Sequence, residues 1–295
     1  MAARNFFRLI GCVSRRQAPV NRSRDKSGPT FIAGNSLFVE SQREAAMSRS
    51  QAGSTMVLQT ENRESGDMRM ILEQSRGDAS ARHLSFWKQG LGRVPDTVWD
   101  ETELETLVLA ENGLCEVSER IGGLKKLRML DLGHNALTSV PDALGALDGL
   151  TDFLYLHDNR LTELSSSLGR LQKLRYLNIS QNAFAVLPES VTCLKSLIEL
   201  RASDNRLTSL PDSIARLSRL REFHLRNNQL TTLPESIGEL LELRQIDLRG
   251  NPLTALPASI VTLPRLEKLD LRWIESLDPP PWIADLEARG CAVYR

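Results

Sequence analysis

Hydrophobic residues recur with a fixed period along most of the chain. From Leu104 onward the sequence follows the pattern Leu-x-x-Leu-x-Leu-x-x-Asn-x-Leu-x-x-Leu-Pro-x-x-Ile-x-x-Leu-x-x, and the same unit begins again at Leu127. The first half of this unit alternates apolar and polar positions, which predicts a short strand, and the Ile-x-x-Leu half predicts a helical turn. One such unit cannot bury its apolar face alone, so the pattern predicts a stack of coils that share one core.

A column of asparagines marks the register of these coils. Its spacing is constant except for one step, which is longer because of a single insertion within residues 150–156. We expect each amide to be buried where the chain leaves the strand, because an amide can donate to and accept from main-chain groups that the turn leaves unpaired. This structural column comprises Asn112, Asn135, Asn159, Asn182, Asn205, Asn228 and Asn251.

Extrapolation of the period sets the number of coils. It places Gln89 in the asparagine column before the regular repeats and Ile274 after them, which gives about nine coils with a degenerate coil at each end. Terminal coils need a cover for solubility. The predicted repeat domain therefore spans 81–295, with an N-terminal cap coil at 81–103, seven regular repeats over 104–265, and the last coil with a C-terminal cap at 266–295.

The motif Leu-x-x-Leu-x-Leu-x-x-Asn-x-Leu resembles the leucine-rich repeat family. The Leu-Pro-x-x-Ile-x-x-Leu half is similar to the intracellular, Ras-group-related type, and the tail from Leu269 through Pro279–Ile283 is similar to the ends of bacterial cytosolic repeat proteins. This resemblance implies an α/β repeat solenoid. Its expected form is a curved horseshoe with a parallel concave β-sheet and short helical or irregular convex turns.

The segment 1–80 differs from the rest of the chain in composition. It carries 12 Lys and Arg against 8 Asp and Glu, and it shows no sustained apolar period. Such a Ser/Arg-rich segment is predicted to be largely disordered, because it cannot bury enough apolar surface. Its Arg-rich, acid-free beginning is typical of an organellar transit peptide, and the alternative is a dispensable stretch before a later start at Met47 or Met56. We expect a cytoplasmic protein, or an organellar one if the transit peptide is real.

Composition argues against several functions. The net charge of zero disfavours nucleic-acid binding. The sequence contains no run of about 18 apolar residues, so we expect no membrane-spanning helix. The four cysteines lie far apart, unlike zinc ligands, and no common catalytic or nucleotide motif is present. His134 and His157 lie on adjacent coils near Asp131 and Asp158, but an open sheet lacks an enclosed pocket. We therefore expect surface histidines and no catalytic residue, cofactor or metal.

The strand positions that alternate with the inward leucines are predicted to be exposed on the concave face. Nine strands would make this face roughly 40 Å long, large enough for a protein partner. An aromatic patch in the N-terminal half and arginines in the C-terminal half are typical interface anchors. The alternative for the charged half is that opposite charges pair across strands and solvate the sheet. The candidate partner-binding residues are Met129, Phe153, Tyr155, His157, Tyr176, Arg201, His224, Arg226, Arg249 and Arg272.

These features predict a non-catalytic scaffold or adaptor that binds a protein partner through the concave sheet, as a monomer. The resemblance to the Ras-group repeat type implies, as an alternative, a regulatory adaptor of a small GTPase or kinase signalling pathway. A further alternative is the substrate-recognition module of a ubiquitin-ligase-type effector that lacks its catalytic domain. Too few residues follow the last coil to form such a domain.

Overall fold

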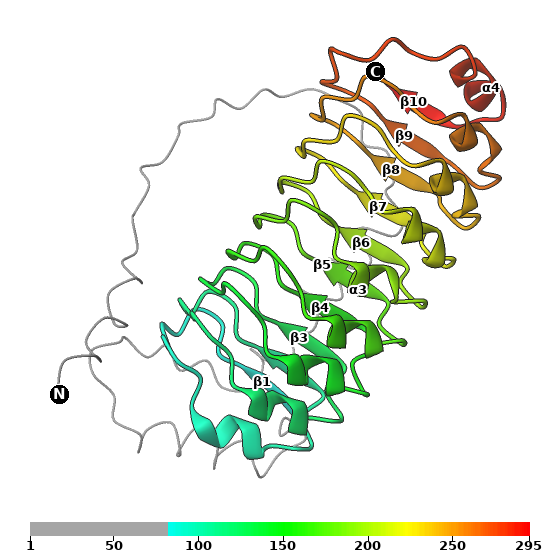
Figure 1. The fold of residues 1–295 in the computed structure, drawn as a ribbon. Helices are drawn as coiled ribbons and strands as arrows, with labels where there is room; N and C mark the ends of the chain where they lie inside the picture. Colours follow the sequence, from blue (N-terminus) through cyan, green and yellow to red (C-terminus); the bar gives the residue numbers. More distant parts are fainter. Residues whose placement is uncertain (1–81) are drawn as a thin grey trace, which may run out of the picture. The chain divides into compact units, whose positions relative to one another are not determined.

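The computed structural model describes residues 82–295, which form one continuous stack of coils (Figure 1). The predictions made for residues 1–80, including disorder and a transit peptide, lie outside the described residues. Within 82–295 no helix is long and apolar enough to cross a membrane.

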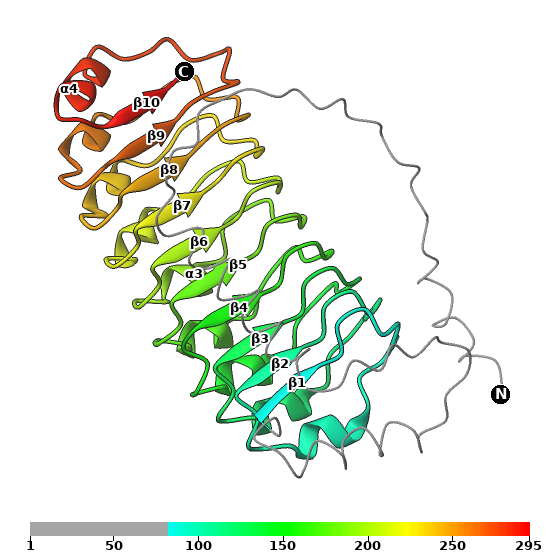
Figure 2. The same cartoon turned by 180° about the vertical axis from the view of Figure 1, so that it is seen from behind.

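Ten short strands form a single parallel sheet in chain order (Figures 1 and 2). The sheet does not close on itself, since β1 pairs only with β2 and β10 pairs only with β9. This architecture confirms the predicted leucine-rich repeat solenoid. The strands are β1 (His83–Ser85), β2 (Thr106–Val108), β3 (Met129–Asp131), β4 (Phe153–Tyr155), β5 (Tyr176–Asn178), β6 (Glu199–Arg201), β7 (Glu222–His224), β8 (Gln245–Asp247), β9 (Lys268–Asp270) and β10 (Ala292–Tyr294).

A short helix lies on the opposite side of each regular coil from its strand (Figure 2). Proline occupies the N-cap in most of these turns. Its fixed φ suits this position, and its missing N–H removes no hydrogen bond of the helical turn. At Ser118 and Ser165 the hydroxyl instead accepts a hydrogen bond from a nearby main-chain N–H in the first turn. The turns are 3-10 helices η2 (Asp96–Asp100), η3 (Glu119–Gly123), η4 (Asp142–Ala146), η5 (Ser166–Arg170), η6 (Asp212–Arg216), η7 (Glu235–Glu239) and η8 (Ala258–Thr262), together with α-helix α3 (Glu189–Thr192).

The core runs the length of the stack between the sheet and the helical turns. Leucines from the strand and turn positions of every coil are almost fully buried in it. Phe184 and Phe223 are its largest fully buried side chains, and Ala202, where the repeat pattern calls for leucine, is fully buried as well. Ala202 and Phe223 lie in adjacent coils, where the main-chain N–H of Ala202 donates to the carbonyl oxygen of His224.

The C-terminal cap adds a strand that the repeat period does not predict. After helix α4 (Ile283–Ala288) the chain returns as β10, which pairs in parallel with β9. The buried side chains of Ile283, Leu286 and Cys291 cover the end of the core. The stack therefore has ten strands, one more than the nine repeat coils, because β10 occupies hydrogen-bonding groups of β9 that would otherwise form an open edge.

Candidate protein-binding face

The asparagine column fixes the turn that follows each strand. Asn228 is representative: its Nδ2 donates to the carbonyl oxygens of Ala202 (2.9 Å) and Leu225 (2.8 Å), and its Oδ1 accepts from the N–H of Leu207 (3.0 Å). Each amide thus joins its own coil to the preceding one. Equivalent bonds recur at all seven positions, from Asn112 to Asn251. This interior hydrogen-bond network fixes the turn after each strand, and so it fixes how the strands are placed along the concave face.

The residue before each asparagine adopts a left-handed backbone conformation. Glu111, His134, Asp158, Gln181, Asp204 and Asn227 all have φ between 51° and 57°, and Gly250 has φ of 67°. Sharp departure from the strand requires this conformation at one position per coil. The side chains at this position form a further column beside the exposed strand positions. The alternation of apolar and polar residues does not reveal this column.

The N-terminal half of the concave face carries a cluster of rings. Phe153 and Tyr155 stack with centroids 6.0 Å apart, and Tyr176 lies 5.1 Å from Tyr155 and 5.6 Å from Phe153. Because parallel strands stand only about 4.8 Å apart, such large side chains cover one another. The predicted exposure is therefore wrong for Met129, Tyr155 and Tyr176, which are 4%, 2% and 3% exposed, whereas Phe153 is partly exposed.

The two histidines of the N-terminal half do lie together. His134 Nε2 is 3.2 Å from His157 Nε2, and His134 Nδ1 is 2.6 Å from a carboxylate oxygen of Asp158. His157 is buried, contrary to the expected surface position, while His134 is partly exposed. Asp131 Oδ1 accepts a hydrogen bond from the main-chain N–H of Gly133, where the chain leaves β3.

Two buried glutamates face each other at the centre of the sheet. Glu199 and Glu222 are register partners on β6 and β7 and are 3% and 2% exposed. Arg201 Nε donates to Glu199 Oε1 at 2.6 Å, and His224 Nε2 lies 3.4 Å from Glu222 Oε2. Burial raises the pKa of Glu199, and although the Arg201 charge opposes this, the nearby charge of Glu222 adds to it.

The C-terminal half carries paired charges. Arg249 donates two hydrogen bonds to Asp247, at 2.8 and 2.6 Å, and Arg272 donates two to Asp270, at 2.9 and 2.8 Å. Burial alone would raise the pKa of Asp247, but the bonded Arg249 guanidinium outweighs burial and lowers it. These two pairs form within one coil, whereas Arg249 with Asp270 (3.5 Å) and Arg226 with Asp204 (3.2 Å) are contacts between neighbouring coils. The arginines remain partly exposed, so pairing and partner contact are compatible.

Trp273 is a surface residue that the repeat pattern does not single out. It occupies the left-handed column at φ 65°, and 67% of it is exposed. The guanidinium carbons of Arg249 and Arg272 lie 5.4 and 6.0 Å from its ring centroid. A bulky residue at positive φ is unfavourable. The signal in the sequence is therefore the presence of tryptophan at the position where the previous coil has Gly250.

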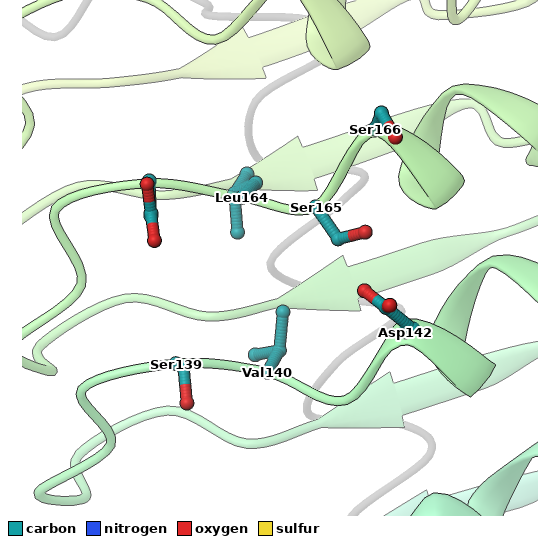
Figure 3. Close-up of a pocket in the computed structure, with 7 residues that line it drawn as sticks. Ser139, Val140, Asp142, Leu164, Ser165 and Ser166 are labelled. Carbon is teal, nitrogen blue, oxygen red and sulfur yellow. The ribbon is translucent and has the colours of Figure 1, made fainter.

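A shallow depression of about 400 Å³ lies on the side of the stack away from the sheet. Figure 3 shows Ser139 and Val140 of one coil and Leu164, Ser165 and Ser166 of the next along its walls. Asp142 and Glu163 are the titratable residues that line it. It is open to solvent, and within residues 82–295 no hydrogen bond joins its serines to the carboxylates of Asp142 or Glu163, so the concave face is the better candidate for function.

Comparison with protein families identifies the chain. The leucine-rich repeat family model matches residues 102–161, 152–207, 197–253 and 218–273, which together cover more than half of the chain. The chain belongs to the leucine-rich repeat family. Leucine-rich repeat domains serve as protein-interaction scaffolds, and the fold is generally non-catalytic.

Solved structures with the same architecture come from bacteria and plants. A leucine-rich repeat protein of Leptospira interrogans has 24% identity, covers 78% of this chain and 69% of its own, and gives a TM-score of 0.59. The leucine-rich repeat domain of the type III effector XopL has 22% identity, covers 92% of this chain and 97% of its own, and gives 0.64. At these identities, both similarities show only that the fold is shared.

A third structure is the ectodomain of the Arabidopsis thaliana receptor kinase GASSHO1/SCHENGEN3 in complex with CASPARIAN STRIP INTEGRITY FACTOR 2. It has 32% identity, a TM-score of 0.58, and covers 65% of this chain. This chain spans about a quarter of that ectodomain, since 24% of it is covered. The search of curated proteins returns no match to this sequence.

Proposed function

We propose that this protein is a non-catalytic, protein-binding scaffold and that its partner contacts the C-terminal half of the concave face. Trp273 carries this proposal, because an exposed tryptophan is held at positive φ beside two arginines. Tryptophan and arginine are the residue types that contribute most to binding at protein interfaces. The turn requires positive φ at this position in every coil, so it is the large exposed ring placed there that favours a role in recognition over a role in packing.

Accessibility supports the C-terminal half over the aromatic patch. The side chains of Arg226 and Arg272 are 39% and 40% exposed, whereas Tyr155 and Tyr176 have almost no accessible surface. Phe153 remains available at the edge of the ring cluster. The candidate residues of the N-terminal half therefore contribute mainly rigidity, and the partner's main contacts are assigned to Arg226, Arg249, Arg272 and Trp273.

Affinity capture with paired variants tests this assignment. The full-length protein, Trp273→Ala, and a control Asp212→Ala/Glu239→Ala are each used as bait, and the recovered proteins are compared by mass spectrometry. Asp212 and Glu239 are exposed on the helical turns η6 and η7, on the opposite side of the coils. We expect one partner that the parent and the control retain and that Trp273→Ala weakens about tenfold or more.

Loss of the same partner in the helical-turn control, with full retention in Trp273→Ala, would contradict the proposal. Trp273→Ala is preferred to Arg272→Ala because Asp270 is fully buried and would lose its bidentate partner. Thermal unfolding of each bait shows whether a lost partner reflects a lost fold.

A further inference from the structure

The centre of the concave face brings three metal-ligating side chains to one point. Glu199, Glu222 and His224 each offer one ligand atom, and these atoms lie within 4.8 Å of one another. Two of the residues are register partners on adjacent strands, and the third is two positions further along β7, so all three side chains leave the same face of the sheet. The rigid parallel ladder therefore holds the three donors in place.

The separations suit a first-row transition ion. His224 Nε2 lies 3.7 Å from Glu199 Oε1 and 3.4 Å from Glu222 Oε2. Bonds of about 2.0–2.2 Å to a tetrahedral Zn²⁺ place two ligand atoms roughly 3.3–3.6 Å apart. The two distances from His224 are close to these values, and the oxygens of Glu199 and Glu222 lie within 4.8 Å of each other, so side-chain rotations would complete the coordination.

The charge balance of the site also calls for a cation. Glu222 is 2% exposed, and among residues 82–295 the only hydrogen-bonding group in contact with its carboxylate is His224 Nε2, at 3.4 Å. A charge-assisted hydrogen bond is shorter, about 2.7–2.9 Å. The buried carboxyl group of Glu222 thus lacks a short hydrogen bond within these residues, while Glu199 beside it is bonded to Arg201.

From this geometry we propose that Glu199, Glu222 and His224 form a Zn²⁺ site at the junction of β6 and β7. One imidazole nitrogen with two carboxylate oxygens is a donor set that zinc accepts, whereas Mg²⁺ and Ca²⁺ prefer oxygen ligands in larger number. The His224 side chain is 21% exposed, so the ion enters from the concave face, and its fourth position holds water. The proposal is independent of the protein-binding function.

Arg201 competes with a zinc ion for the carboxylate of Glu199. Its guanidinium bonds to the same Oε1 of Glu199 that lies nearest to His224. A bound zinc ion must share or displace this contact, since two cations close together repel each other. Removal of the Arg201 charge is therefore expected to tighten zinc binding, an effect that loss of a purely structural contact would not produce.

Titration calorimetry with ZnCl₂ on chelator-treated, full-length protein tests the site. We expect saturable binding of one ion per chain at this position, weakened at least about tenfold in Glu222→Gln and tightened severalfold in Arg201→Gln. MgCl₂ at the same concentrations should give no saturable heat. His134→Gln, which alters the other histidine pair on the concave face, is the matched control and should bind as the parent does.

The proposal fails if zinc binding is unchanged in Glu222→Gln, if it is lost in His134→Gln, or if the parent shows no saturable binding at micromolar zinc. Circular dichroism of the metal-free variants establishes that each is folded. Should Glu222→Gln not fold, His224→Gln is measured in its place, with the same expected loss and the same contradicting result.

Discussion

The interior of the stack and its concave face share the same repeat period, but residue types are largely constant from coil to coil in the interior and vary on the concave face. In the interior every coil repeats one set of contacts, from the leucine core to the asparagine amides that join neighbouring coils. On the concave face a single column changes from Phe153 through Glu199 to Lys268. Interior positions must hold each coil against the next, so stability resides there, whereas concave positions are free to vary, and we propose that recognition resides in them.

The largest effect is expected from the interior. Phe223→Ala should lower the free energy of unfolding by about 3–5 kcal/mol, because it leaves a cavity at a fully buried site. Phe223→Leu restores the residue of the repeat pattern and should cost much less. Urea denaturation of both variants measures the difference. Equal costs would mean that the Phe223 ring is not packed in the core as described.

A smaller loss is expected from the asparagine column. Asn228→Ala removes two donors and an acceptor that bond to buried main-chain groups, and it should cost about 1–3 kcal/mol. Gln229→Ala, at the exposed neighbouring position, is the control and should change stability by less than about 0.5 kcal/mol. If the two substitutions cost the same in urea denaturation, the amide network does not hold the coils together.

The concave charges should contribute less stability and a defined dependence on pH. The pKa of Asp247 is lowered in the folded protein, so its ionised form stabilises the fold above the ordinary pKa of 3.8. That contribution disappears as the pH falls from 3.8 through the lowered pKa. Asp247→Asn should therefore cost about 1 kcal/mol at neutral pH and nothing at the acid end of the range. A cost that stays constant across this range in acid-to-neutral unfolding curves would contradict the ion pair.

The smallest effect, and one of opposite sign, is expected at Trp273. Glycine accepts positive φ without strain, so Trp273→Gly should leave stability unchanged or raise it by up to about 1 kcal/mol. The same variant should lose partner binding, which would separate recognition from stability at one residue. A thermal unfolding midpoint well below that of the parent would show instead that Trp273 supports the fold.

The sequence predicted the interior far better than the surface. Its period determines the coils, because each repeat position has one packing partner in the next coil, and the asparagine column follows from the same rule. The burial of Tyr155 and Tyr176 could not be predicted, since alternation gives the direction of a side chain and not the neighbours that cover it. The strand β10 escaped prediction because so short a segment outside the period carries no recognisable pattern.

The clusters on the face depend on register across strands. Glu199 and Glu222 belong to successive coils and meet only because β6 and β7 pair at these positions. The position of Trp273 follows from a turn conformation that the spacing of leucines does not encode. Where a repeat pattern is this regular, departures within the variable columns are the places to look for function.

Site-directed photo-crosslinking tests the central claim most directly. A benzoylphenylalanine is placed at position 245, which is partly exposed on β8 of the concave face, and in a second variant at position 239, exposed on the helical turn η7. Each variant is irradiated in complex with the captured partner. The account predicts a cross-linked partner from position 245 and none from position 239, whereas cross-linking from position 239 alone would show that the partner binds the opposite side of the stack.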